Sequence, residues 1–148
     1  MSVDIRVNAA TVVELLTHLT QCSTDFVPHL SDRVDLSEYA RKIAAHAVRF
    51  EAWDGELVGL VAVYRDTSSH SAFVTNVSVL RSHRSLGIAS CLLSELSAYC
   101  EQNAFRRVSL EVDAGNLRAV SLYHARGFIV EKMDGRTMTL AMTLGERK

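Results

Sequence analysis

Two hydrophobic periods alternate along the chain, and each change of period predicts a new element of secondary structure. An apolar–polar alternation over residues 5–7 predicts a short first strand. Helical spacing follows over residues 10–20, with Asn8 at the position of an N-terminal cap. The residues that recur on one face of this helix are Val13, Leu16 and Thr20.

The segment over residues 21–35 follows neither period and contains Pro28, the only proline of the chain. A connection of this length is more typical of a binding loop than of a minimal connector. A second helix is then predicted to be capped by Asp35 or Ser37 and to end near His46. Its apolar face consists of Tyr39, Ile43 and Ala47.

Strand patterns dominate from residue 48 onward. They cover residues 48–53, 56–64, 71–80 and 106–112, and two strands within 128–144. The step Asp54-Gly55 favours a tight hairpin turn between the first two of these strands. The step Asp134-Gly135 joins the last two strands.

Helical spacing returns over residues 86–102 and again over residues 116–126. Gly127 follows the second of these helices in the position where a left-handed residue commonly ends a helix. The chain contains no repeat, low-complexity tract or linker. The pattern therefore predicts one α/β domain with a mixed sheet over residues 1–148.

Composition narrows the class of protein. Hydrophobic residues make up 48% of the chain and charged residues 22%, as in an ordinary globular domain. The net charge of −1 argues against binding to nucleic acid or to an anionic membrane. The N-terminus resembles no secretion signal, and the three cysteines lack the spacing of a disulfide framework or zinc site. We therefore expect a cytoplasmic protein with reduced thiols and no bound metal.

The junction RSHRSLGIAS, residues 81–90, gathers hydrogen-bond donors where a strand pattern passes into a helix pattern. Amide groups in the first turn of a helix have no partner within the helix and attract anions. Gly87 lets the backbone approach phosphate oxygens closely, and Arg84 adds a charged fork. This spacing predicts a phosphate cradle, and the alternative is an ordinary solvated turn.

A second segment of the sequence supports the prediction of a phosphate cradle. In SLEVDAGNLRAVSLYHARGF, a strand leads into a helix that ends at Gly127 and Phe128. Together with VSVLRSHRSLGIASCLL, this segment resembles the GCN5-related N-acetyltransferase (GNAT) superfamily, over about residues 73–128. The residues that fall in register with the family's second motif are Asn116, Ala119, Leu122, Tyr123, Gly127 and Phe128.

This resemblance implies an α/β fold with a mixed, mostly antiparallel central sheet flanked by helices. It implies that acetyl-CoA lies between two splayed parallel central strands, with its pantetheine arm added like a strand beside Val77, Ser78 and Val79. The alternative for these three residues is a plain core strand. The backbone expected to hold the CoA diphosphate comprises Arg84, Ser85, Leu86, Gly87, Ile88, Ala89 and Ser90. Glycine or a basic residue is commoner in the family at the position of Ser85.

The same resemblance points to two catalytic side chains. Tyr123 is expected to hydrogen-bond and protonate the departing CoA thiolate, and otherwise to pack in the core. Glu111 is the candidate base for the amine, and otherwise forms an ion pair with an arginine such as Arg107. Asn116 can cap its helix, contact the cofactor, or do both.

The acceptor site is expected along the 21–35 loop, the second helix and the hairpin strands. The loop residues available there are Cys22, Asp25, Phe26, His29, Asp32 and Asp35. Several acidic groups favour a cationic amine, and the compact chain favours a small molecule. The alternatives are a peptide N-terminus, a protein lysine, or a CoA-binding sensor without turnover; a homodimer is left open. Cys22 is discounted as a nucleophile because the sequence assigns it no histidine partner.

Overall fold

The computed structural model describes residues 3–26 and 28–144. Val27 of the expected loop and both ends of the expected 1–148 domain lie outside the described residues. The strands are β1 (Asp4–Val7), β2 (Val48–Trp53), β3 (Leu57–Asp66), β4 (Ser71–Val79), β5 (Arg107–Asp113), β6 (Ile129–Asp134) and β7 (Thr137–Thr143). The helices are α1 (Val12–Cys22), α2 (Leu30–Arg33), α3 (Leu36–His46), α4 (Ile88–Gln102) and α5 (Leu117–Ala125), with 3₁₀ turns η1 (Ser23–Asp25) and η2 (Arg81–His83).

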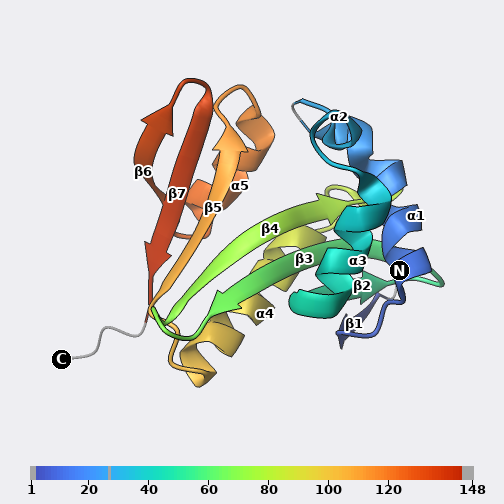
Figure 1. Ribbon diagram of the computed structural model, residues 1–148, viewed down its shortest axis with the longest axis horizontal. Coiled ribbons are helices and arrows are strands. Elements are labelled where there is room, and N and C mark those ends of the chain that lie inside the picture. Colours follow the sequence, from blue (N-terminus) through green and yellow to red (C-terminus); the bar gives the residue numbers. More distant parts are fainter. Residues whose placement is uncertain (1–2, 27, 145–148) are drawn as a thin grey trace.

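The strands form one seven-stranded sheet in the order β1-β2-β3-β4-β5-β7-β6. Neighbouring strands are antiparallel except β4 and β5, which are parallel. The β4–β5 pairing covers only Ser71–Val74 against Arg107–Leu110. Beyond these residues the two strands diverge (Figure 1). The predicted mixed, mostly antiparallel sheet with a splayed parallel pair is confirmed.

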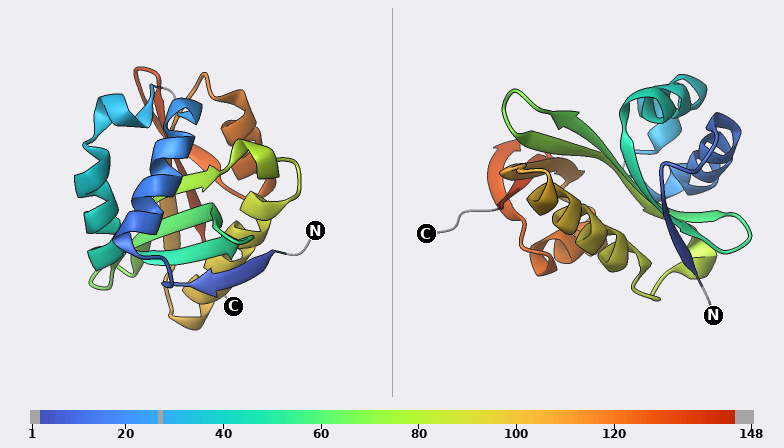
Figure 2. Two further views of the ribbon diagram at one scale, coloured as in Figure 1. Left: turned by 90° about the vertical axis from the view of Figure 1, so that its right-hand side faces the viewer. Right: turned by 90° about the horizontal axis from the view of Figure 1, so that it is seen from below.

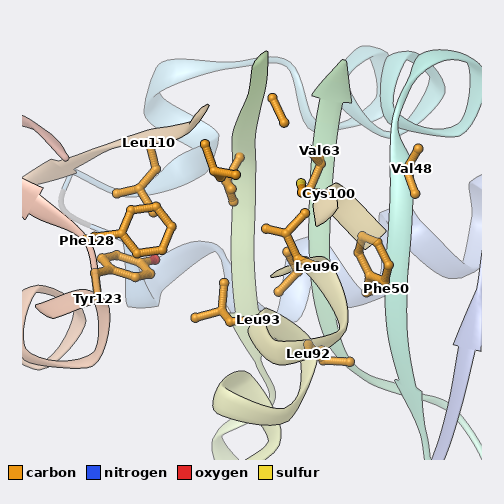
Figure 3. Packing of buried hydrophobic residues seen from close by; sticks show 14 of the residues in the cluster. Val48, Phe50, Val63, Leu92, Leu93, Leu96, Cys100, Leu110, Tyr123 and Phe128 are labelled. Carbon is orange, nitrogen blue, oxygen red and sulfur yellow. The ribbon is translucent and has the colours of Figure 1, made fainter. Parts of the chain in front are cut away.

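Helices cover both faces of the sheet. Figure 2 shows α1 and α3 on one face and α4 with α5 on the other. On the α1/α3 face, Leu15, Leu19 and Ile43 pack on Leu60. On the other face, the buried side of α4 packs against β2–β5, and Figure 3 shows part of this cluster. The α4 residues that Figure 3 labels there are Leu92, Leu93, Leu96 and Cys100.

The start of α4 lies unusually close to β3. A methyl group added at Gly59 of β3 would come within 2.7 Å of Cγ2 of Ile88 and 3.4 Å of Cδ1 of Leu92. Both atoms belong to the first turns of α4, so the missing side chain allows the close approach. This packing positions the helix start, where the sequence predicts a phosphate cradle.

The predicted start and face of the first helix are wrong. Thr11 rather than Asn8 caps α1, in a reciprocal pair of hydrogen bonds with Glu14. Asn8 has a positive φ of 58° and accepts instead from the Arg49 amide. Val13, predicted on the recurring apolar face, is exposed. The residues that α1 buries are Leu15, His18, Leu19 and Cys22, because contact with α3 and β3 decides which face turns inward.

A bulge in β4 changes which side chains face which layer. Ala62 of β3 pairs with Asn76 and Val63 pairs with Val74, so Thr75 has no partner on β3. An extra residue of this kind reverses the alternation of the residues that follow it. Before the bulge, Val74 joins the α4 cluster. After it, Asn76 turns toward the α1/α3 layer.

A buried carboxylate anchors the segment that enters α1. Glu51 is 0% exposed, and its oxygens accept hydrogen bonds from the amides of Ala9 and Ala10 at 3.0 and 3.1 Å. They also accept from Nε of Arg49 and Nε1 of Trp53, both at 3.1 Å. One side chain thus ties β2 to the turn between β1 and α1.

Replacing this carboxylate should strongly destabilise the fold. In Glu51→Ala, the Arg49 guanidinium, the Trp53 indole and the amides of Ala9 and Ala10 lose this partner, and we expect the free energy of unfolding to fall by about 3–5 kcal/mol. Urea unfolding at pH 7 measures the change. The matched control is Glu95→Ala on the exposed side of α4, where a change within about 0.5 kcal/mol is expected. Equal losses in the two variants would contradict the anchor.

Candidate active site

A cavity of about 440 Å³ opens where β4 and β5 separate. Its walls come from the C-terminal halves of both strands, the start of α4, α5, and the segment between α1 and α3. In open sheets, ligands bind beyond the carboxyl ends of parallel strands, at the point where the chain directions diverge. The place of the cavity in the fold therefore makes it the candidate active site.

The wall formed by β4 offers unpaired backbone. Val77, Ser78 and Val79 all line the cavity, as predicted for the pantetheine arm. Their partners on the other side are in β3, where pairing continues to Val79. Ladder pairing with β5 has ended at Val74. The edge of β4 that faces β5 is therefore free for an extended ligand.

The start of α4 is built differently from the starts of α1, α3 and α5. Side chains of Thr11, Asp35 and Asn116 cap those three helices. The cap of α4 is Gly87, which has a positive φ of 78° and no side chain to offer. The first-turn amides of α4 thus stay available to an anion, as the phosphate cradle requires.

Most of the predicted cradle reaches the cavity. Leu86 does not line it, and its side chain is half exposed. Ser85 has a positive φ of 66°, a conformation that costs glycine least, which accounts for glycine being common in the family at this position. The cradle residues that line the cavity are Arg84, Ser85, Gly87, Ile88, Ala89 and Ser90.

An ion-pair network connects the cradle to the segment after α1. The Asp25 carboxylate of η1 binds Arg84 at 2.6 Å and Arg81 at 2.9 Å. His83 Nε2 lies 2.9 Å from a carboxylate oxygen of Asp54 in the β2–β3 turn. The predicted phosphate ligand Arg84 is therefore already oriented by a carboxylate, and it would share its guanidinium with a bound diphosphate.

Tyr123 lines the cavity from α5 and is almost fully buried. Its ring packs edge-on against Phe128, with 5.9 Å between the ring centroids, as Figure 3 shows. Burial raises the pKa of the phenol, because the charged form loses its hydration. The hydroxyl therefore stays protonated and can donate a hydrogen bond into the cavity.

Glu111 lines the cavity from β5, with its side chain exposed. Val108, Leu110 and Val112 face the α4 cluster, so Glu111 lies on the opposite side of the strand, as the alternation predicts. The alternative ion pair with Arg107 does not form, because Arg107 binds Glu131. Within residues 3–26 and 28–144, Glu111 has no ion pair.

Asn116 stands at the junction of β5 and α5. Its Oδ1 accepts a hydrogen bond from the Ala119 amide at 3.3 Å, so the side chain caps α5. The residue also lines the cavity. Both positions considered from the sequence are therefore compatible with one conformation.

The acceptor side contains fewer of the expected residues. Of the six loop residues, Asp25 and Phe26 line the cavity, and Asp35 instead caps α3. Asp25 is already neutralised by two arginines, so it adds little free negative charge. Arg33 of α2, which the sequence did not single out, lines the cavity as well.

Asp113 also lines the cavity but binds Arg136, and Arg118 adds a positive charge to the lining. Among the lining carboxylates of the described residues, Glu111 is thus the one without an ion pair.

Cys22 does have a histidine neighbour, contrary to the expectation from sequence. Its Sγ lies 3.7 Å from Nε2 of His18, one helical turn earlier. Burial, with a smaller contribution from Asp25, raises the pKa of this thiol to about 12, so it remains protonated. Burial lowers the pKa of His18 to about 4, so the ring is neutral and does not activate the thiol. Cys22 is not positioned to act as a nucleophile.

Comparison with known protein families identifies the class of protein. Residues 12–128 match the model of the acetyltransferase (GNAT) family. The chain therefore belongs to the GNAT family of acetyltransferases. It is an N-acetyltransferase that uses acetyl-CoA, which confirms the predicted enzyme class and cofactor. No match was found among the curated proteins.

Solved structures share the whole fold. The ribosomal-protein-S18-alanine N-acetyltransferase of Escherichia coli superposes with a TM-score of 0.81 at 18% identity, over 99% of this chain and 97% of that one. The PaiA N-acetyltransferase of Thermoplasma acidophilum, solved with coenzyme A, gives 0.76 at 16% identity, over 97% and 100%. NAA60 of Arabidopsis thaliana, solved with a bisubstrate analogue, gives 0.75 at 21% identity, over 96% and 98%. At these identities the likeness shows the fold.

Among the helices of the described residues, none has the length and apolarity that crossing a bilayer requires.

The buried His18 should make stability depend on pH. The unfolded ring takes up a proton near pH 6.5, whereas the folded ring does so only near pH 4, so acid favours the unfolded state. We expect this residue to lower the free energy of unfolding by about 2 kcal/mol between pH 7 and pH 5, and by about 3 kcal/mol by pH 4. Urea titrations across this range measure it.

The comparison is between His18→Gln and His46→Gln, which removes an exposed histidine of α3. His18→Gln should flatten the dependence between pH 7 and pH 5, and His46→Gln should leave it unchanged. A slope that survives His18→Gln would show that other groups cause it.

Proposed function

We propose that this enzyme transfers the acetyl group of acetyl-CoA to the primary amine of a small molecule by direct attack, without an acyl-enzyme. The observation that carries the proposal is the gathering of four features around one cavity. These are the free edge of β4, the uncapped start of α4, the protonated phenol of Tyr123 and the unpaired carboxylate of Glu111.

In this proposal the cofactor follows the β4 wall. Its diphosphate accepts hydrogen bonds from amides of the 84–90 segment, and Arg84 adds its guanidinium. The pantetheine arm pairs with the free edge of Val77–Val79, which directs the thioester toward the point where β4 and β5 separate. Asn116, at the start of α5, lines the same cavity.

Glu111 is the proposed base. An aliphatic amine with a pKa near that of lysine is almost entirely protonated at pH 7, and freeing its lone pair costs about 4 kcal/mol. Glu111 takes this proton directly or through water, and the nitrogen then attacks the thioester carbon. The new N–C bond forms as the carbonyl becomes tetrahedral.

Tyr123 is the proposed acid. When the tetrahedral intermediate collapses, the C–S bond breaks and the electron pair stays on sulfur. The phenol donates a hydrogen bond to this thiolate and passes it a proton, and the second proton that the attacking nitrogen must lose returns to the phenolate through water, so CoA leaves as a thiol and the amide is neutral. Burial raises the pKa of Tyr123, so the phenol is protonated at neutral pH and available as the donor.

The acceptor side supports a small molecule. Phe26 lines the cavity and packs against both apolar clusters, so it forms a fixed apolar wall on this side. A free amine that fits beside Phe26 and reaches Glu111 meets the requirement. Transfer to a peptide N-terminus or a protein lysine is the outcome that would replace this part of the proposal.

The cradle predicts a specific effect of glycine replacement. In Gly87→Val, the added side chain meets no protein atom within 4 Å of its Cβ, but it stands where phosphate oxygens would approach and strains a positive φ. We expect affinity for coenzyme A to fall at least tenfold by calorimetry. Gly55→Val is the matched control, because Gly55 also has a positive φ and open space but lies outside the cavity. Equal affinities in the two variants would refute the cradle.

The catalytic assignments predict separate effects in a transfer assay. Acetylated products from pooled amines and peptides are identified by mass spectrometry, and kcat is then measured on the best acceptor. Tyr123→Phe should lower kcat about 100-fold or more with coenzyme A affinity unchanged. Glu111→Gln should lower the rate most at neutral pH and less at high pH, where the amine loses its own proton.

Tyr99→Phe, near the far end of α4, is the control for loss of a phenol hydroxyl. Unchanged kcat in Tyr123→Phe would remove this residue from the mechanism. Binding of coenzyme A without transfer to any amine would favour a CoA-binding sensor.

A further inference from the structure

Arg33 is a cavity-lining residue that the mechanism above leaves unused. It is the last residue of α2 and borders the cavity on the acceptor side. Within residues 3–26 and 28–144, its guanidinium forms no ion pair. Its nearest acidic neighbours in the sequence, Asp32 and Asp35, do not line the cavity, and Asp35 caps α3. The cavity therefore has a positive charge at its edge that no carboxylate of the described residues neutralises.

Tyr39 relates this charge to the point where β4 and β5 separate. Burial raises the pKa of the Tyr39 phenol, and the positive charge of Arg33 is among the groups that oppose this rise, so the guanidinium acts on the phenol. The phenol oxygen lies 2.8 Å from the carbonyl oxygen of Thr75. Thr75 directly follows Val74, the last residue of β4 that pairs with β5. The charge of Arg33 thus acts where the strands diverge.

Glu111 borders the cavity at the same level from β5. Leu110 is the last residue of β5 that pairs with β4, so Glu111 and Thr75 are the first residues beyond the paired segment. Glu111 lies on the side of β5 away from the α4 cluster. Leu30 of α2 belongs to the cluster on the α1/α3 face, so Arg33 borders the cavity from that same side. One unpaired positive charge and one unpaired negative charge therefore flank the opening.

Arg118 is the other cavity-lining arginine without an ion pair among the described residues. It belongs to α5, whose Tyr123 packs in the α4 cluster. Arg118 thus approaches the cavity from the opposite face of the sheet. The cradle has an arginine of its own in Arg84, which Asp25 orients. Arg33 is therefore the arginine placed for the acceptor.

We propose that the acetyl acceptor is a free amino acid, whose carboxylate accepts hydrogen bonds from the Arg33 guanidinium while its amino group gives its surplus proton to Glu111. The inference rests on the proposed function and names the class of its acceptor. The planar fork of a guanidinium matches the two oxygens of a carboxylate. A zwitterion has no net charge, and its two charged groups give both Arg33 and Glu111 a partner.

The same charges disfavour an acceptor that is only cationic. A diamine would bring a second ammonium group toward Arg33, and like charges repel more strongly in a cavity than in open water. Asp25 and Asp113 do not offset this repulsion, because each is bound to arginine. The cationic acceptor expected from the sequence therefore narrows to an amine that also carries an anionic group.

Competition among acceptors tests the class. The native enzyme and acetyl-CoA are mixed with free amino acids, their carboxamides, aminoalkyl phosphates, diamines and short peptides, and acetylated products are identified by mass spectrometry. Amino acids should be acetylated, and KM for the best one should be about 10- to 100-fold below that for its carboxamide. A preference for carboxamides, diamines or peptides would overturn the inference. A preference for aminoalkyl phosphates would overturn the assignment of a carboxylate.

Variants test the contact with Arg33. Arg33→Gln should raise KM for the best amino acid about 10- to 100-fold, with KM for its carboxamide and affinity for coenzyme A unchanged. Arg33→Lys keeps the charge without the planar fork and should restore part of the loss. The acid and the carboxamide differ in amine pKa by the same amount for every variant, so the ratio of their KM values isolates the carboxylate contact.

Arg41→Gln is the matched control. Arg41 is an exposed arginine of α3 that binds the Ser37 hydroxyl and lies outside the cavity lining, so its loss should leave both KM values unchanged.

The outcomes separate this inference from the proposed function. If the native enzyme acetylates no amine, the proposed function fails. If it acetylates amines and Arg33→Gln raises KM for the acid and the carboxamide equally, or changes neither, the role of Arg33 fails while the transferase function stands.

Discussion

The early end of pairing between β4 and β5 is the constraint on which the rest of the site depends. Parallel strands that stayed paired to their ends would fill each other's hydrogen bonds and leave no edge for a ligand. Here four residue pairs hold the strands together, and beyond Val74 and Leu110 each strand keeps its other neighbour. The sheet stays intact as a whole, while one internal edge becomes a binding surface.

The bulge at Thr75 gives this edge two kinds of neighbour. Val74 belongs to the α4 cluster, and Ser78 instead bonds to His18 of α1. Tyr39 of α3 donates its hydroxyl proton to the Thr75 carbonyl or contacts its hydroxyl, both at 2.8 Å, which fixes the bulge from the helix side. The cavity therefore meets an apolar layer on one side and a hydrogen-bonded polar layer on the other. Tyr123 belongs to the apolar layer and Glu111 lies on the opposite side of the sheet, so the two side chains reach the cavity from different faces.

Ion pairs connect two of the segments that surround the cavity. Asp25 binds Arg84 and Arg81, which orients the cradle before any anion arrives and ties it to the acceptor segment. An arriving diphosphate would meet a guanidinium that is already in place, so less side-chain freedom is lost on binding. One ion-pair network thus joins the segment before α4 to the segment after α1, and both segments line the cavity.

The order of the elements, and two segments that line the cavity, could be predicted from the amino-acid sequence alone. Periodicity located the strands, Asp35 and Asn116 stood as caps where helices begin, and Gly87 marked an unusual helix start, because these features depend on neighbours along the chain. Only tertiary structure decided which face of α1 is buried, since packing against α3 and β3 outweighs a weak local pattern. Tertiary structure also brought His18 within hydrogen-bonding distance of Ser78, which lies 60 positions later in the chain. The strand pattern around Ser78 does not indicate that contact. Hydrogen bonds between distant segments follow from the register of the sheet, and a single extra residue at Thr75 resets that register.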